Sequence, residues 1–279
     1  MDFGVGLKVD YDPETLVRIV RYLETHGFQN LWFPDERFFM DAFTLMSMSA
    51  LSTTKIKLGT AVTDPFIRHP ALTASISATI DAISNRRVIL GLGAGLAGFA
   101  QLGITRKRPA TALRETVDLI RRLQRGETVT MEGDVIKARS CKLDFVPGRQ
   151  IPIYIAGRGE KILQLAGEVG DGVIIGALSS EVGLRYANLN IQKGIAKAGR
   201  RPEEVTKALW IHTCISRDGT TARKAIGGMI AYLIYSSPDV VTKLGVPEDV
   251  KNQITSAVKT RLNGIPSYQG FKKLADLVP

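Results

Sequence analysis

The sequence predicts an α/β protein built on a parallel sheet with helices outside it. Strand-like and helix-like segments alternate along most of the 279 residues, and this alternation is typical of parallel sheets. No linker, low-complexity tract or internal repeat divides the chain, so we expect a single domain over residues 1–279. A (β/α)₈ barrel and an open doubly wound sheet both fit the pattern, and the length suits a barrel.

The first half of the chain supplies four strand–helix units. We expect strands at 3–9, 30–33, 56–62 and 87–92, and helices at 42–52, 70–84 and 111–125. A further helix begins at Asp12-Pro13, with Asp12 as the cap and Pro13 in the first turn, and ends at Gly27.

The second half begins with an interruption. Two alternating runs flank the Glu-Gly-Asp at 132–134, which predicts a hairpin insertion near 127–145. Strands follow at 152–156, 172–175 and 207–216, with helices at 160–169 and 181–198. Residues 220–277 read as an extra helical region, broken at Pro238, Pro247 and 264–266.

These segments give seven strands, and an eighth strand–helix unit is not apparent. A barrel of seven strands would expose two strand edges, which proteins usually cover. We therefore expect either that the native chain continues past Pro279 or that another segment closes the gap.

Composition narrows the class of protein. No apolar run is long enough to cross a membrane, and residues 1–12 lack the pattern of a signal peptide. Cys141 and Cys214 are far apart and fit two reduced thiols of a cytoplasmic protein. The net charge of +10 fits a basic surface, nucleic acid or a polyanionic small molecule, although no basic motif with interleaved aromatic residues indicates nucleic acid.

Functional residues in parallel α/β folds gather at the carboxyl ends of the strands. Asp35 and Glu36 follow the second strand, and neighbours in a strand point to opposite faces, so at most one should point inward. That one could be a general acid or base. Alternatively, the pair forms a helix cap and a salt bridge to Arg37.

Two glycine-rich turns follow later strands. Gly91, Gly93 and Gly95 let the backbone approach a neighbour closely, but no acidic residue completes a dinucleotide fingerprint. Gly157-Arg158-Gly159 opens a helix after a strand, where free N–H groups and the helix dipole favour an anion. This turn is either a phosphate site or only a tight turn.

The three histidines do not form a site in the sequence. His69 precedes Pro70 at a helix start and is best read as a cap, and His26 ends a helix. His212 lies within the last predicted strand, and its direction is open. No residues have the spacing of a metal site or a nucleophile–base–acid triad.

Three motifs resemble the bacterial-luciferase-like superfamily. They are "LGTAVTDPFIRHPALTA", "RRVILGLGAGLAGFAQLGI" and "IPIYIAGRGEKILQLAGEVGDGVI". They are most similar to the branch that uses the deazaflavin coenzyme F420, in particular to methylenetetrahydromethanopterin reductases. The resemblance implies a (β/α)₈ TIM barrel, a homodimer or higher homo-oligomer, and no nucleic acid or membrane partner.

The resemblance also implies where the coenzyme binds. The third strand would end in a bulge with a cis peptide at Ala61-Val62 that backs the ring, and Gly157-Arg158-Gly159 would hold the phosphate. The implied coenzyme contacts are Thr60, Ala61, Val62, Gly93, Ala94, Gly95, Gly157, Arg158, Gly159, Gly176 and Ala177.

The implied activity is hydride transfer between the deazaflavin C5 and a small organic substrate, such as methylenetetrahydromethanopterin or a related pterin, with Asp35 and Glu36 as candidate catalytic residues. Two positions depart from the family: Glu36 stands where related enzymes have histidine, and Gly6 where the reductases have glutamate. An FMN-dependent monooxygenase and a non-catalytic binding relative are the alternatives.

Overall fold

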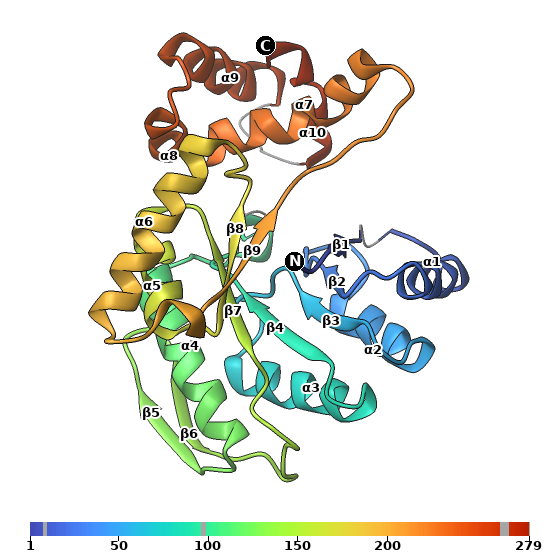
Figure 1. The fold of residues 1–279 in the computed structure, drawn as a ribbon. Coiled ribbons are helices and arrows are strands. Elements are labelled where there is room, and N and C mark those ends of the chain that lie inside the picture. Colours follow the sequence, from blue (N-terminus) through green and yellow to red (C-terminus); the bar gives the residue numbers. More distant parts are fainter. Residues whose placement is uncertain (8–9, 96–98, 263–267, 279) are drawn as a thin grey trace. The chain divides into compact units, whose positions relative to one another are not determined.

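A computed structural model describes residues 1–7, 10–95, 99–262 and 268–278. Among them, seven strands form one sheet in the order β1-β2-β3-β4-β7-β8-β9 (Figure 1). The strands are β1 (Gly4–Gly6), β2 (Asn30–Phe33), β3 (Lys57–Thr60), β4 (Val88–Leu92), β7 (Ile153–Gly157), β8 (Gly172–Gly176) and β9 (Thr206–Trp210). The five strands from β1 to β7 in this order pair in parallel, so the predicted parallel α/β fold is confirmed.

The chain divides into two compact units, which are described separately. The sheet unit comprises Met1–Gly157, Lys161–Ile174 and Asn190–Ala208; the helical unit comprises Arg158–Glu160, Ile175–Leu189 and Leu209–Pro279. The single domain expected over residues 1–279 stays a prediction.

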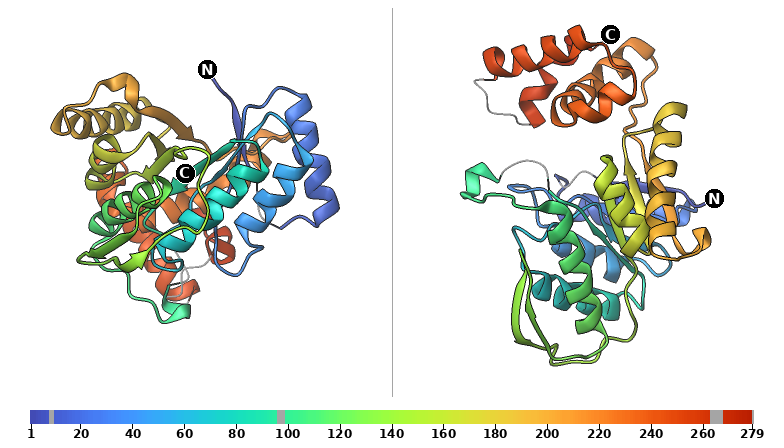
Figure 2. Two further views of the ribbon diagram at one scale, coloured as in Figure 1. Left: turned by 90° about the horizontal axis from the view of Figure 1, so that it is seen from below. Right: turned by 90° about the vertical axis from the view of Figure 1, so that its left-hand side faces the viewer.

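Helices α1 (Pro13–Thr25), α2 (Ala42–Ser52), α3 (Pro70–Ile83) and α4 (Pro109–Gln124) connect the first strands of the sheet unit. They form a row of neighbours beside the strands (Figure 2). Asp12 caps α1 by accepting from the Thr15 N–H at 2.9 Å, with Pro13 in the first turn, as the sequence predicts. Asp41 caps α2 in the same way through Thr44. These caps satisfy backbone donors that a helix start leaves unpaired.

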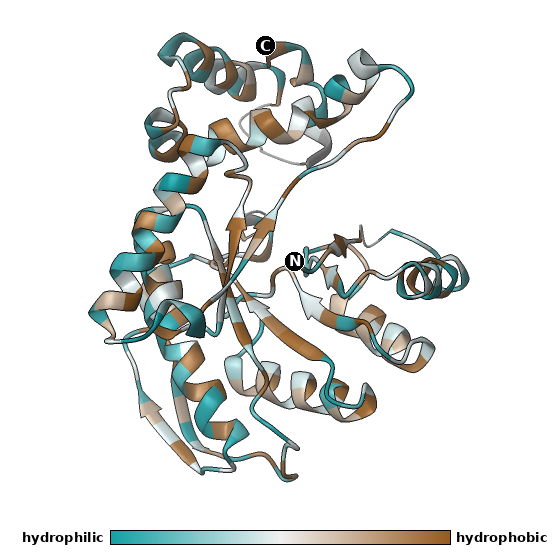
Figure 3. Cartoon of the chain, viewed as in Figure 1, coloured by the Kyte–Doolittle hydropathy of each residue, from teal (hydrophilic) through white to brown (hydrophobic). Residues whose placement is uncertain are grey.

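The core of the sheet unit lies along the strands. Every residue of β4 is buried, and the strand is coloured hydrophobic along most of its length in Figure 3. Phe33 and Leu58 are fully buried on neighbouring strands. A strand buried on both faces reads as a continuous apolar run, which is why "VILGL" was recognisable in the sequence.

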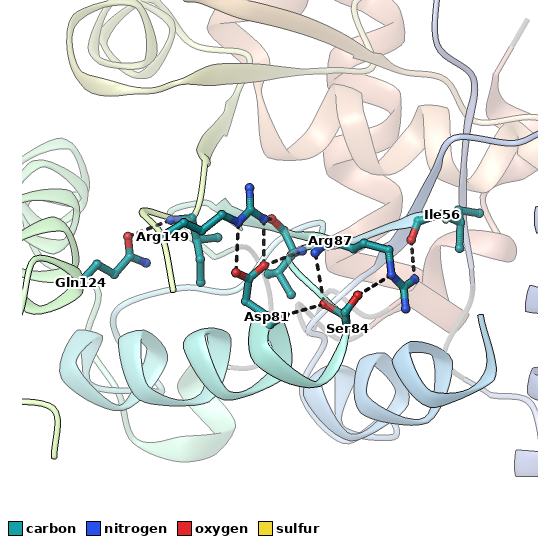
Figure 4. A network of polar contacts seen from close by, with 8 residues as sticks. Ile56, Asp81, Ser84, Arg87, Gln124 and Arg149 are labelled. Carbon is teal, nitrogen blue, oxygen red and sulfur yellow. Dashed lines mark hydrogen bonds and ion pairs between the residues drawn. The ribbon is translucent and has the colours of Figure 1, made fainter. Parts of the chain in front are cut away.

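A network of polar contacts lies where β3 and β4 begin (Figure 4). The buried guanidinium of Arg87 donates to the carbonyl oxygens of Ser84, Ile56, Ala50 and Thr53 and to the Thr53 hydroxyl, at 2.6–2.9 Å. Asp81 accepts two hydrogen bonds from Arg149, at 3.0 and 2.8 Å. All donors of the Arg87 guanidinium are therefore satisfied, as a buried cation requires.

The predicted hairpin insertion is present. Strands β5 (Val129–Glu132) and β6 (Lys137–Cys141) pair in antiparallel fashion. The Glu115 carboxylate of α4 accepts from the backbone N–H groups of Asp134, Val135 and Ile136 at 2.8–3.0 Å. One side chain therefore fastens the hairpin turn to the helix.

The later elements are α5 (Glu160–Val169), α6 (Glu181–Lys197), α7 (Gly219–Ser236), α8 (Pro238–Lys243), α9 (Glu248–Arg261) and α10 (Tyr268–Lys272), with short 3₁₀ turns at Ala100–Leu102, Pro202–Glu204 and Ala275–Leu277. In the helical unit, Ile254, Val258, Phe271 and Leu274 are buried together in a core built from α7 to α10. The expected breaks at Pro238 and Pro247 are confirmed; residues 264–266 lie outside the described part of the chain.

Three strands differ from the prediction by more than one residue at an end. β1 is described only over Gly4–Gly6, and residues 8–9 lie outside the described residues. β9 ends at Trp210 instead of 216, and Ile211 and Ile215 beyond it are exposed, so their spacing does not mark a half-buried strand face. β3 ends at Thr60 instead of 62. Among the residues that the structure describes, no eighth strand joins the seven-stranded sheet.

Candidate functional site

A bulge follows β3. Gly59 pairs with Ile89 and Thr63 with Leu92, so the β3 side contains one residue more than the β4 side between these pairs. Ala61 N–H donates to the Phe33 carbonyl at 2.8 Å, whereas Thr63 N–H donates to the Gly91 carbonyl at 3.1 Å. The Ala61-Val62 peptide bond is cis, as the family resemblance implies.

Gly91 and Gly93 are explained by this bulge. A Cβ on Gly91 would lie 1.9 Å from the Thr60 carbonyl oxygen, and a Cβ on Gly93 would lie 2.3 Å from a Val62 methyl carbon. The Thr60 hydroxyl also donates to the Gly91 carbonyl at 2.7 Å and accepts from its N–H at 3.0 Å. These two glycines therefore serve close packing between β3 and β4, the tight-packing interpretation of the glycine-rich motif.

Asp35, after β2, lies beside this bulge. Its side chain is half-buried, whereas Glu36 is exposed, so at most one of the pair points inward, as predicted. Burial raises the pKa of the Asp35 carboxyl, and the nearby carboxylates of Asp41 and Asp64 raise it further. The Thr63 hydroxyl and the Arg68 guanidinium act in the opposite direction.

The alternative reading of Asp35 and Glu36 as a helix cap is wrong, because Asp41 caps α2. Arg37 forms a buried ion pair with Asp64, and its guanidinium lies 3.8 Å from the centre of the Phe99 ring. Asp64 also accepts from the Phe66 N–H at 2.8 Å. Arg37 is thus fixed between an acidic and an aromatic side chain, and it ties the segment after β2 to the segment after β3.

Three polar residues at these strand ends have hydrogen-bonding atoms without a partner, and we refer to them as the strand-end cluster: Asp35, Thr63 and Arg68. The unpartnered atoms are Asp35 Oδ2, Thr63 Oγ1 and Arg68 Nε, and all three are buried. Thr63 has no exposed surface. The Thr63 hydroxyl lies close enough to the Asp35 carboxyl to lower its pKa.

Gly93, Ala94 and Gly95 continue from β4. Gly95 has a φ of +64°. A Cβ at this position would lie only 2.4 Å from the Phe99 ring and 2.9 Å from the Arg37 guanidinium. Arg106 donates to the carbonyl oxygens of Gly95 at 2.6 Å and Ala94 at 3.3 Å. The segment is therefore held by contacts within the sheet unit, and its predicted contact with a coenzyme stays a prediction.

The Gly157-Arg158-Gly159 turn joins β7 to α5. A Cβ on Gly157 would lie 2.5 Å from Ile162, so this glycine serves packing, but a Cβ on Gly159 would meet no atom within 4 Å. Burial lowers the pKa of the Arg158 guanidinium, and the nearby Tyr232 raises it. The open space at Gly159 and the adjacent cation fit the predicted anion site without testing it.

Two histidines have structural roles, as expected. His69 caps α3: Nδ1 accepts from the Ala71 N–H at 3.2 Å, and Nε2 lies 2.9 Å from the Lys137 carbonyl. His26 ends α1 and stacks on Tyr22 with ring centres 3.8 Å apart.

His212 and Ala177 belong to the helical unit. His212 follows β9 instead of lying within it. The residue is exposed, but partial desolvation of its ring lowers its pKa, and the nearby charge of Arg158 lowers it further. Ala177, after Gly176 at the end of β8, has a φ of +56° and donates to the Trp210 carbonyl at 3.2 Å. The predicted coenzyme contacts at Gly176 and Ala177 stay predictions.

Sequence reasoning missed the parts played by Thr63, Arg37 and Arg68. Thr63 was visible as part of the segment after the third strand, but its proximity to Asp35 depends on how two strand ends meet, which the sequence does not show. The two arginines lie in polar loops, where sequence cannot distinguish a buried side chain from an exposed one. Among the described residues, no group of three His, Cys, Asp or Glu side chains could hold a metal ion, and no helix is long and apolar enough to span a membrane.

The chain matches a model of luciferase-like monooxygenases over residues 2–263. It is 37% identical over 260 residues to the 5,10-methylenetetrahydromethanopterin reductase of Archaeoglobus fulgidus, covering 92% of this chain and 78% of that protein. It is 38% identical to the reductase of Methanolobus tindarius, covering 92% of this chain and 79% of that protein.

Solved structures agree with these relatives. The coenzyme F420-dependent tetrahydromethanopterin reductase of Methanopyrus kandleri matches with a TM-score of 0.85 and 30% identity, covering 100% of this chain and 83% of that one. An F420-dependent secondary alcohol dehydrogenase, at 22% identity and a TM-score of 0.75, shares the fold over 98% of this chain and 84% of its own.

Proposed function

Because the chain belongs to the luciferase-like monooxygenase family, and because its similar relatives are F420-dependent reductases and dehydrogenases, we propose that it is an F420-dependent oxidoreductase. The observation that carries this proposal is the 37% identity over 92% of the chain to a methylenetetrahydromethanopterin reductase. The substrate that we propose is a small organic molecule, methylenetetrahydromethanopterin or a related pterin.

Two features of the chain fit the coenzyme. The cis peptide bond at Ala61-Val62 lies in the bulge that would support the ring, and the carboxyl of Asp35 lies beside this bulge. The open space at Gly159 and the charge of Arg158 suit a phosphate. By contrast, the absence of side chains at Gly91 and Gly93 is explained by close packing against Thr60 and Val62, so it is not by itself an argument for a coenzyme contact.

When bound, the deazaflavin supplies or accepts a hydride at C5, and the protein contributes binding, orientation and electrostatics. Backbone groups of residues 60–62 and 93–95 would line the ring and its side chain. The phosphate-bearing part of the coenzyme would be held by Gly157, Arg158, Gly159, Gly176 and Ala177.

Asp35 is the better candidate for proton transfer. Burial raises the pKa of its carboxyl, so it holds a proton more readily than an ordinary aspartate and can donate it to a neighbouring heteroatom. Glu36 is exposed and stands where the related enzymes carry histidine. Its role is to contact the substrate, and this difference, with Gly6, distinguishes the chain from the reductases it resembles.

The test is a titration of the purified protein with F420 and with FMN, followed by turnover of reduced F420 with methylenetetrahydromethanopterin. We expect F420 binding, and reoxidation of reduced F420 that depends on the substrate. Affinity for reduced FMN without affinity for F420 would instead support a monooxygenase. F420 that binds but never turns over with any donor or acceptor would support a binding protein.

By the same family resemblance, we propose a homodimer that works in the cytoplasm. Light scattering of the purified protein would measure the mass of the assembly, and the mass of a single chain would contradict the dimer.

A further inference from the structure

Two neighbouring helices of the sheet unit, α2 and α3, carry almost no charge. α2 has no charged residue, and the only one on α3, Asp81, is buried and paired with Arg149. The outer helices of the same row differ, because Arg18 of α1 and Asp118 of α4 are exposed. A helix without a charged outward side is typical of a protein interior. The composition of α2 and α3 therefore indicates that their outer side is covered.

The outward side chains of these two helices form a face without charge. We call it the α2–α3 face and define it by Ser47, Leu51 and Ser52 of α2 and by Leu72, Thr79 and Ile83 of α3. Leu51 is 77% exposed and Leu72 is 62% exposed. Large apolar side chains exposed on adjacent helices, which contact each other here, mark a surface for interaction.

The hydroxyl groups of the α2–α3 face are already satisfied. Ser47, Ser52 and Thr79 each donate to the carbonyl oxygen four residues earlier in their own helix, at 2.8–2.9 Å. Covering these donors would therefore leave none of them without a partner, which removes the main cost of burying a polar group. The face can become dry without new hydrogen bonds.

Charge identifies the partner that this face fits. The chain has a net charge of +10, so two copies repel each other wherever their basic surfaces meet. The α2–α3 face avoids this repulsion, and the centres of protein interfaces are in general depleted of charged residues. An acidic protein or a nucleic acid would instead be attracted to cations elsewhere on the surface. A second copy of this chain therefore fits the face better than an anionic partner does.

A hollow extends the face at the start of α3. Its volume is about 390 Å³, and Leu72 and Ser75 line it together with Leu143 and Phe145. With α3 about 21 Å long and its neighbour about 10 Å away, the two helices cover roughly 400 Å², half of the about 800 Å² that each partner of a standard interface buries. The hollow adds further area, and an apolar side chain of a second copy can enter it as a buried anchor.

We propose that two copies of this chain associate through the α2–α3 face about a twofold axis. In such an arrangement the same patch is used by both copies, so Leu51 and Leu72 of each chain are covered by the other. This inference rests on the proposed homodimer, for which it names the surface.

The test places a cation on the face. Leu51→Arg and Leu72→Arg each introduce two guanidinium groups per dimer, one from each copy. Leu189→Arg is the matched control, because Leu189 lies on α6, outside the face, and is 54% exposed. Sedimentation equilibrium of the wild type and the three variants gives the mass and the dimer dissociation constant, and circular dichroism verifies that each variant is folded.

We expect the wild type and Leu189→Arg to sediment as two chains, whereas Leu51→Arg and Leu72→Arg raise the dimer dissociation constant at least about a hundredfold. Because the face is uncharged, the wild-type constant should change less than about threefold between low and high salt. Unchanged constants for both face variants would overturn this surface but leave the homodimer standing. A wild type with the mass of one chain would overturn both. F420 binding by the same samples tests the proposed activity separately, since the face contains none of the candidate coenzyme contacts.

Discussion

At the amino ends of β3 and β4, each donor of the Arg87 guanidinium reaches an oxygen within 2.9 Å. At the carboxyl ends of β2 and β3, Asp35, Thr63 and Arg68 each keep a buried polar atom without a partner. Both regions belong to the sheet unit and use the same kinds of side chain. Complete hydrogen bonding at the amino ends serves stability, whereas functional residues of parallel α/β proteins gather at the carboxyl ends.

The largest effect should come from the satisfied end. Arg87→Leu would leave several buried carbonyl oxygens unpaired, and we expect the free energy of unfolding to fall by about 3–5 kcal/mol. Denaturant unfolding measures this. Arg185→Leu is the control, because Arg185 forms an exposed pair with Glu181 on α6 and should change stability by about 0.5 kcal/mol or less. Equal effects of the two variants would contradict the structural role of Arg87.

A carboxyl-end residue should behave in the opposite way. If Arg158 supports the coenzyme phosphate, Arg158→Ala should weaken F420 binding by about 1.5–3 kcal/mol, the value of one charge-assisted hydrogen bond. Titration at two salt concentrations measures this, and the stability of the variant should change little. Unchanged affinity would remove Arg158 from the site.

Thr60 and Thr63 allow bonded and unpartnered hydroxyls to be compared within one segment. The Thr60 hydroxyl bonds to both backbone groups of Gly91, so Thr60→Val should cost about 1–2 kcal/mol of stability. Thr63→Val removes a hydroxyl without a partner and should change stability by roughly 0.5 kcal/mol or less. A loss at Thr63 as large as at Thr60 would mean that its hydroxyl is structurally bonded.

The smallest effect concerns Asp35 and pH. Burial raises the pKa of this carboxyl in the folded protein, so the folded state binds the proton more tightly than the unfolded state. The resulting stabilisation is present below the ordinary aspartate pKa and is lost as the pH rises through the raised value. Asp35→Asn stays neutral, and above this window it should therefore be more stable than the wild type by roughly 1 kcal/mol or less.

The advantage of Asp35→Asn should shrink as the pH is lowered. Unfolding curves over a pH series measure this, with the exposed Asp144→Asn as the control. A difference between Asp35→Asn and wild type that does not vary with pH would contradict the shifted carboxyl.

Local patterns predicted most of the sheet unit. The strand at Asn30–Phe33 and the helices at Ala42–Ser52 and Glu160–Val169 match the predicted bounds, because caps, glycines and periodicity agree there. The predicted end of β9 was wrong, because alternation of apolar residues does not show whether they pair with a neighbouring strand. The division into two compact units could not be predicted, because no linker or change of composition marks it in the sequence.

The site was predicted unevenly. The positions at the ends of strands followed from the order of elements, and Asp35 followed from its place after β2. The packing roles of Gly91 and Gly93 depend on contacts with Thr60 and Val62 from another strand, which spacing along the chain cannot show. Spacing along the chain also cannot show that the buried Thr63 hydroxyl lacks a hydrogen-bond partner.

The carboxylate of Asp41 performs two tasks with two different oxygens. Oδ1 caps α2 through the Thr44 N–H at 2.8 Å, and Oδ2 holds Arg68 of the strand-end cluster at 3.1 Å. Few substitutions at this position would therefore preserve both contacts: serine or asparagine would keep the helix cap but lose the ion pair with Arg68. Among homologues, we expect residues 41 and 68 to change together, so that an aspartate lost at one is accompanied by an arginine lost at the other.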